Sequence, residues 1–74
     1  MKVNGDKAVE WLKKAADSGD AQAKYDLGTI YFEGKLMQKD LDEAISWFTS
    51  GAELNHAESQ FQLGQMFFKG EGVP

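Results

Sequence analysis

The sequence has no cysteine, one histidine and one proline among its 74 residues. Without cysteine the chain cannot form a disulfide, and no Cys/His cluster has the spacing of a zinc site. A domain of this length buries only about 60% of the surface that its unfolded chain exposes, so its core is small. We therefore expect its stability to depend on dense helix packing or on contact with a neighbouring protein.

The sequence also lacks a basic patch and a long apolar run. Its formal net charge is −4, and acidic and basic residues are interspersed, so no face can neutralise phosphates and we expect no nucleic-acid partner. Apolar stretches of two or three residues are far below the roughly 20 that cross a bilayer. Residues 1–4 lead into no signal-peptide core. The sequence thus predicts a soluble protein with no membrane contact, and both the cytoplasm and the periplasm stay open as its compartment.

Side chains suited to catalysis or metal binding are equally sparse. His56 stands at a predicted helix start with no cysteine and no orienting third group, so we expect a surface residue. Glu53, His56 and Glu58 straddle a turn instead of sharing one helical face, which argues against a metal site. Residues 70–72 lack the lysine and the following helix of a phosphate-binding loop. The sequence therefore predicts no enzyme, no metal and no cofactor.

What the sequence does contain is an internal repeat with an offset of 36 residues. The segment from Ala8 to Gly34 has a second copy that begins at Ala44. The identical pairs are Asp6/Asp42, Ala8/Ala44, Trp11/Trp47, Ala16/Ala52, Ala21/Ala57, Leu27/Leu63, Gly28/Gly64, Phe32/Phe68 and Gly34/Gly70. Similar pairs include Val9/Ile45, Leu12/Phe48, Tyr25/Phe61, Ile30/Met66 and Tyr31/Phe67. A period of this length indicates a protein built from stacked repeats.

Apolar spacing and capping residues predict four helices and no strand. The predicted ranges are 6–18, 21–33, 41–54 and 57–69. Asn4 or Asp6, Asp20, and Asp40 with Glu43 in a capping box are the expected amino-terminal caps. Gly19, Gly34, Asn55 and Gly70 are the expected left-handed residues at the carboxyl ends.

Three residue types inside these helices carry specific expectations. Trp11 and Trp47 share one repeat position, so we expect both in the core. The recurrence of Gly28 at Gly64 suggests a close approach of another helix backbone, because glycine inside a helix costs about 1 kcal/mol relative to alanine. We expect the stem of Lys24 to pack along the core, with its polar head reaching a loop or solvent.

Three motifs together resemble those of the Sel1-like repeat family, which is related to the tetratricopeptide repeats. They are A-x-A-x-Y-x-L-G-x-x-Y-x-x-G at 21–34, D-x-x-x-A-x-x-W at 40–47, and A-x-S-x-F-x-L-G-x-x-F-x-x-G-x-G-V at 57–73. The resemblance implies an all-α, right-handed solenoid of four antiparallel helices. The signature positions in this chain are Ala8, Trp11, Ala16, Ala21, Leu27, Gly28, Tyr31, Gly34, Ala44, Trp47, Ala52, Ala57, Leu63, Gly64, Phe67 and Gly70.

Two positions depart from the family pattern. Leu36 replaces the second glycine of the G-x-G-V loop that Gly72 keeps, so we expect the 34–39 loop to differ in conformation. Gly51 replaces the first of the paired alanines kept at Ala15 and Ala16, which predicts a slightly weaker third helix.

The resemblance also implies where the repeats divide. Residues 4–19 correspond to the second helix of one repeat, 20–55 to a complete repeat, and 56–74 to the first helix of the next. The whole of 1–74 then looks like a segment of a longer solenoid without polar caps. We accordingly expect Val9, Leu12, Met66 and Phe67 to lack part of their cover.

Family members act as adaptors, so the resemblance implies a protein-interaction scaffold that binds a protein or peptide. By analogy with the tetratricopeptide groove, the expected binding residues are Gln22, Tyr25, Thr29, Phe32, Glu33, Glu58, Phe61, Gln65, Phe68 and Lys69. The four aromatic residues in this set are predicted either to anchor a partner or to pack against adjacent helices.

Two other functions stay open at this stage. One is self-association, in which the first helix of one chain covers the last helix of another and forms a swapped or head-to-tail oligomer. The other is a regulatory domain that belongs to a larger enzyme.

Overall fold

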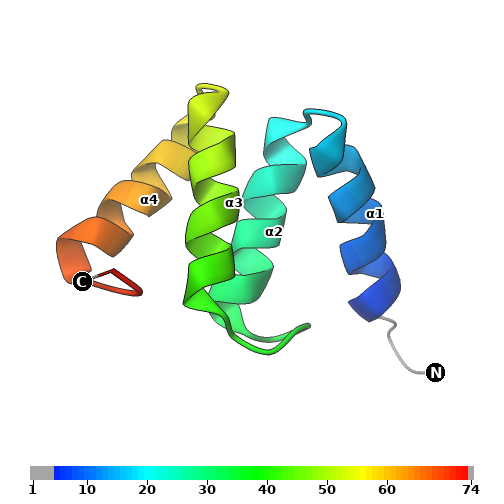
Figure 1. The fold of residues 1–74 in the computed structure, drawn as a ribbon, viewed down its shortest axis with the longest axis horizontal. Helices are drawn as coiled ribbons and strands as arrows, with labels where there is room; N and C mark the ends of the chain where they lie inside the picture. Colours follow the sequence, from blue (N-terminus) through cyan, green and yellow to red (C-terminus); the bar gives the residue numbers. More distant parts are fainter. Residues whose placement is uncertain (1–4, 74) are drawn as a thin grey trace.

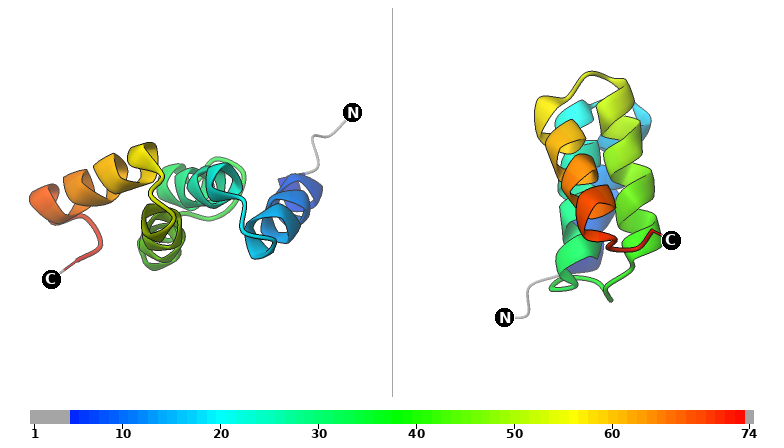
Figure 2. Two further views of the ribbon diagram at one scale, coloured as in Figure 1. Left: turned by 90° about the horizontal axis from the view of Figure 1, so that it is seen from above. Right: turned by 90° about the vertical axis from the view of Figure 1, so that its left-hand side faces the viewer.

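The computed structural model describes residues 5–73, which fold into four α-helices. These are α1 (Gly5–Asp17), α2 (Ala21–Glu33), α3 (Leu41–Glu53) and α4 (Ala57–Lys69). The helices stand in chain order, each antiparallel to the one before (Figure 1). Seen from above, α3 lies on the opposite side of the row from α2 and α4 (Figure 2). The described residues contain no strand, and the predicted all-α solenoid is confirmed.

Local capping chemistry explains where α2 and α3 begin. The Asp20 side chain accepts a hydrogen bond from the Ala23 amide at 3.1 Å, which satisfies one of the free donors at the helix start. Asp40 does the same for the Glu43 amide at 3.1 Å. A capping box would also have the Glu43 side chain accept from the Asp40 amide. This part of the prediction is wrong, because the Asp40 amide donates to the Tyr31 carbonyl at 3.0 Å. That bond ties the start of α3 to the end of α2.

The predicted left-handed residues are confirmed at all four helix ends, with φ of 95° at Gly19, 70° at Gly34, 63° at Asn55 and 73° at Gly70. The predicted cap of α1 has a different outcome. Asp6 lies inside α1, and Asn4 lies outside the described residues.

The buried apolar side chains form two clusters. Val9, Ala16, Ala23 and Leu27 join α1 to α2. Tyr31, Ala44, Phe48 and Met66 join α2, α3 and α4. Trp47 and Met37 border both clusters, so α2 and α3 form the centre of the molecule.

The expectation that four residues lack part of their cover is wrong for two of them. Val9 is only 4% exposed and Met66 is fully buried, because each packs into one of the two clusters. Leu12 is half-buried, whereas Phe67 is 56% exposed. Exposed apolar surface therefore concentrates on α4 and on part of α1.

A paired substitution adapts the contact between α3 and α4. A β-carbon on Gly51 would lie 2.5 Å from the Ser59 hydroxyl and 3.1 Å from its β-carbon. The same repeat positions in α1 and α2 hold Ala15 and Ala23, and Ala15 packs against the apolar cluster to which Ala23 belongs. Gly51 therefore makes room for the larger Ser59, which is fully buried. The family motif predicts only a weaker third helix, and the steric reason becomes visible when Gly51 and Ser59 are compared with Ala15 and Ala23.

Candidate functional site

One face of α2 encloses the ring of Phe48. Tyr25 and Phe32 lie on this face, with ring centroids 5.7 Å and 6.5 Å from the Phe48 centroid. Between them lies Gly28, where an added β-carbon would come within 2.6 Å of two Phe48 ring carbons. Phe48 itself is fully buried. We call Tyr25, Gly28 and Phe32 the α2 face.

The close approach to Gly28 corrects a sequence prediction. We expected another helix backbone at this glycine, but the nearest atoms belong to the Phe48 side chain. The physical reason is the size of the ring, because a phenylalanine on α3 reaches the α2 backbone only where no β-carbon intervenes. The glycine therefore admits a bulky side chain.

The equivalent face of α4 is empty. Phe61 is 66% exposed and Phe68 is 92% exposed, although they correspond to Tyr25 and Phe32. Gly64 has no atom within 4 Å of the position that its β-carbon would occupy. We call Phe61, Gly64 and Phe68 the α4 face. It has the residue types and spacing of the α2 face, and no described side chain fills it.

A polar contact accompanies the Phe48 packing. The Lys24 ammonium donates to the Ser50 hydroxyl at 2.6 Å and lies 5.6 Å from the centroid of the Trp47 ring. The lysine head therefore contacts α3 itself, and the predicted loop or solvent position is wrong. It adds a charge-assisted hydrogen bond and a cation–π contact to the α2–α3 interface.

The two tryptophans occupy different environments. Trp47 is half-buried between the two apolar clusters, and its indole nitrogen is buried without a hydrogen-bond partner in the described structure. Trp11 is 76% exposed, so its prediction as a core residue is wrong. α3, which contains Trp47, packs against both α2 and α4, whereas the main helix contact of α1 within residues 5–73 is with α2. Trp11 therefore adds a large exposed apolar surface to α1.

His56 is the amino-terminal cap of α4, and its prediction as a surface residue is wrong. Its Nδ1 accepts from the Ser59 amide at 3.2 Å and lies 2.9 Å from the Ser59 hydroxyl. The opposite nitrogen, Nε2, lies 3.2 Å from the Gln22 side-chain oxygen, and the ring centroid lies 5.4 Å from that of Tyr25. Only 15% of the side chain is exposed. These contacts join α4 to α2.

The ten predicted binding residues divide into different environments. Tyr25 and Phe32 are half-buried against Phe48, which matches the alternative in which the aromatics pack between helices. Phe61 and Phe68 are exposed. Among the polar members, Gln22, Glu33, Glu58 and Lys69 are exposed, and Thr29 and Gln65 are half-buried. A binding role for these ten residues stays a prediction.

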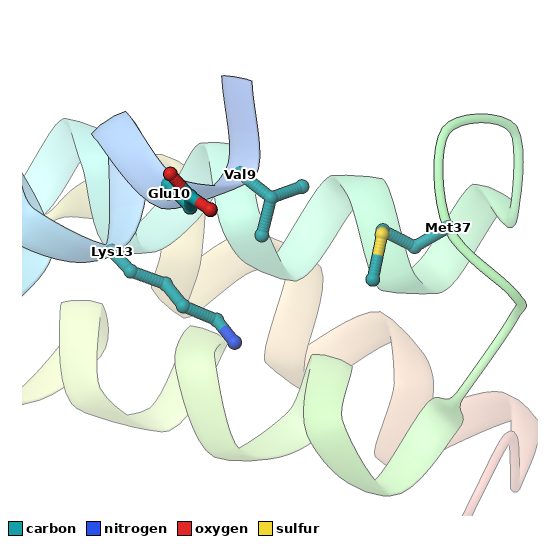
Figure 3. Close-up of a pocket in the computed structure, with 4 residues that line it drawn as sticks. All are labelled: Val9, Glu10, Lys13 and Met37. Atoms are coloured by element: carbon teal, nitrogen blue, oxygen red, sulfur yellow. The ribbon is translucent and has the colours of Figure 1, made fainter. Parts of the chain in front are cut away.

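A shallow pocket lies between α1 and the loop before α3. Its volume is about 240 Å³, and Val9, Glu10, Lys13 and Met37 line it. Figure 3 shows the first three on α1 and Met37 on the loop. This volume is below the roughly 300–1,000 Å³ of most ligand pockets. Its single carboxylate and single ammonium group form no convergent set of polar groups.

Two features of residues 5–73 bear on other functions. No three histidine, cysteine or carboxylate side chains in this range are grouped so that they could hold a metal ion. None of the four helices is both long enough and apolar enough to span a membrane.

A family model and a solved structure both relate this chain to Sel1 repeat proteins. The family model described as Sel1 repeat matches three consecutive segments, residues 1–20, 21–56 and 57–74. The crystal structure of a Sel1 repeat protein from Oxalobacter formigenes is similar over 99% of this chain, with 34% sequence identity and a TM-score of 0.90. This chain spans 30% of the length of that protein. None of the curated proteins matches this chain.

Proposed function

This chain belongs to the Sel1 repeat family, whose repeats generally mediate protein–protein interaction, and we propose that it holds a helix of a partner protein against the α4 face. The observation that carries the proposal is the contrast between two glycines. A β-carbon added to Gly28 would lie 2.6 Å from the Phe48 ring, whereas a β-carbon added to Gly64 would have no atom within 4 Å.

The chemistry of the partner follows from that contrast. Phe61 and Phe68 flank the open glycine as two exposed aromatic side chains, and aromatic anchors of this kind supply much of the binding energy at interfaces. The face suits an amphipathic helix that presents one large apolar residue to Gly64, in the helix-in-groove mode of recognition. Glu58 and Lys69 lie at opposite ends of α4 and are exposed, so they supply polar contacts at the rim. Under this proposal the chain acts as an adaptor module.

A peptide titration tests the proposal. The probe is a synthetic peptide with residues 40–55 of this chain, which contains α3 and Phe48, added to the isotope-labelled full-length chain. We expect NMR shift changes at the amides of Phe61, Gly64 and Phe68. The matched control peptide carries Phe48→Ser and should produce much smaller changes at the same concentration.

A variant of the α4 face provides a second control. Gly64→Ala places a β-carbon where the apolar residue of the probe must lie, so we expect it to weaken binding of the peptide with residues 40–55. Equal binding to both proteins, or shift changes that avoid α4, would contradict the proposal.

A further inference from the structure

We propose that the helix bound by the α4 face is α1 of a second copy of this chain, packed as α3 packs on α2 within one copy. This inference rests on the proposed function and adds the identity of the partner. It depends on the internal repeat. Because α1 is equivalent to α3 and α4 is equivalent to α2, the molecule carries on α1 and α4 the two surfaces that form the α2–α3 interface.

α1 is the repeat equivalent of α3. With the 36-residue offset, Ala8, Trp11 and Leu12 correspond to Ala44, Trp47 and Phe48. In α3 those three residues are buried or half-buried, whereas Ala8 and Trp11 are exposed and Leu12 is half-buried. Within residues 5–73 α1 therefore presents the surface that α3 uses to contact α2.

The apolar contact can be followed residue by residue. Leu12 of the second copy takes the place of Phe48 and lies over Gly64 of the first copy. Phe61 and Phe68 then contact Leu12 as Tyr25 and Phe32 contact Phe48. Leucine is smaller than phenylalanine, so it fits a site with the same glycine floor without a steric clash.

The polar contact is preserved with its direction reversed. Lys24 on α2 donates to Ser50 on α3, and the equivalent positions are Gln60 on α4 and Lys14 on α1. The Gln60 amide nitrogen already donates to the Ala52 carbonyl at 3.2 Å, which leaves its side-chain oxygen as an acceptor. The Lys14 ammonium of the second copy can donate to that oxygen. The exchange of donor and acceptor keeps the contact complementary.

Charge also favours this orientation. α2 and α3 are antiparallel, so α1 of the second copy runs antiparallel to α4. Its last turn contains the exposed residues Lys14 and Asp17, and Lys14 then lies near the first turn of α4, which contains the exposed acidic residue Glu58. Opposite charges at an interface favour one orientation and one partner over others.

The contact joins two different surfaces, so it is heterologous. After one such contact the pair of copies keeps one free α1 surface, on the first copy, and one free α4 face, on the second. Copies can therefore add at both sides, and the assembly grows with concentration unless it closes into a ring. Trp11, now 76% exposed, would become covered at each junction in the way that Trp47 is covered within one copy.

Sedimentation of the full-length chain over a concentration series tests the inference. We expect the average mass to rise from 8.2 kDa at high dilution, without a plateau at the dimer. Gly64→Ala should weaken association by about ten- to a hundredfold, because filling a packed interface with one extra carbon is costly. Ser46→Ala, at an exposed position on α3 outside both surfaces, is the matched control and should associate like the parent chain.

Two variants with complementary defects give the sharper result. Gly64→Ala keeps an intact α1 surface, and Trp11→Ser keeps an intact α4 face. At a concentration just above that at which the parent chain begins to associate, each variant alone should stay at 8.2 kDa, while an equimolar mixture should form one heterodimer of twice that mass and grow no further. Both altered positions are exposed, so both variants are expected to fold.

Two results would overturn the inference. One is a parent chain that stays at 8.2 kDa at concentrations near 1 mM, and the other is an association unaffected by Gly64→Ala and Trp11→Ser. If the chain stays monomeric while the α3 peptide still binds the α4 face, the inference alone fails and the partner is a helix of another protein. If the peptide also fails to bind, the proposed function fails with it.

Discussion

The Phe48 ring lies so close to the Gly28 backbone that a β-carbon added to Gly28 would come within 2.6 Å of two ring carbons. The glycine is therefore part of the interface between α2 and α3. Gly64, its equivalent on α4, has no neighbour within 4 Å of the same position. One repeat position is thus occupied in one helix and open in another, and that difference defines the surface that we propose for a partner.

Substitution of the exposed phenylalanines should leave the fold intact. Phe61→Ser with Phe68→Ser removes two rings that are 66% and 92% exposed. Each change should alter the free energy of unfolding by no more than about 0.5 kcal/mol, as is usual for surface positions. Circular dichroism and thermal unfolding of the dilute chain measure this.

Phe48→Ala is the buried comparison for that double variant. Removal of a buried phenylalanine costs about 3–5 kcal/mol. Typical stability for a domain of this length is about 4–11 kcal/mol, so this variant should lose a large part of its stability and unfold at a much lower temperature. Loss of cooperative unfolding in the Phe61→Ser, Phe68→Ser chain would instead show that these rings belong to the core.

The Gly51 and Ser59 pair should behave as a coupled unit. Gly51→Ala alone is expected to be destabilising, although alanine favours helix, because its β-carbon would collide with the Ser59 hydroxyl. Ser59→Ala alone removes the contact with His56 Nδ1 at 2.9 Å, a loss of about 1 kcal/mol.

The double variant recreates the pair found at Ala15 and Ala23, so Ser59→Ala should relieve most of the effect of Gly51→Ala. We expect a coupling free energy of about 0.5–3 kcal/mol in a double-mutant cycle measured by urea unfolding. Simple addition of the two single effects would be evidence against a steric contact between these residues.

The role of His56 as a helix cap gives a further prediction. His56→Ala should lower the free energy of unfolding by about 1 kcal/mol, because the Ser59 amide loses its acceptor at the start of α4. His56→Asn keeps a side-chain acceptor at the cap and should retain more stability. Urea denaturation of both variants measures the difference, and an equal loss in the two would attribute the effect to the Tyr25 ring contact instead.

Much of the secondary structure could be predicted because its signals are local. The helix ranges 21–33 and 57–69 agree with α2 and α4 at both ends. Asp20 caps the first turn of α2, and a left-handed glycine follows the last turn of both helices. Such signals depend on a few neighbouring residues and hold whatever the rest of the chain does.

The environment of each side chain could not be predicted from the same repeat. Trp11 and Trp47 share a residue type and a repeat position, yet one is 76% exposed and the other half-buried. Tyr25 and Phe61 also share a repeat position, yet Tyr25 is half-buried and Phe61 is 66% exposed. Burial depends on which helices are adjacent in space, and a repeat pattern gives the same expectation to every copy.

Other details were missed because two distant residues determine them together. The space at Gly51 depends on Ser59, and the cap at His56 extends to Gln22 on another helix. The space at Gly51 could have been inferred from the 36-residue repeat, in which the pair Ala15 and Ala23 is replaced by Gly51 and Ser59. Nothing comparable in the sequence indicates that the Phe48 side chain, and not a helix backbone, approaches Gly28.

The most direct measurement compares Gly28→Ala with Gly64→Ala by urea unfolding of the dilute chain. Alanine favours helix over glycine by about 0.5–1 kcal/mol, and this gain applies to both positions. At Gly28 the new β-carbon collides with the buried Phe48 ring, which costs about 1–3 kcal/mol, so we expect a net loss of stability. At Gly64 nothing opposes the gain, so we expect the chain to become more stable. Two effects of the same sign would contradict an α4 face that repeats the α2 face and is open.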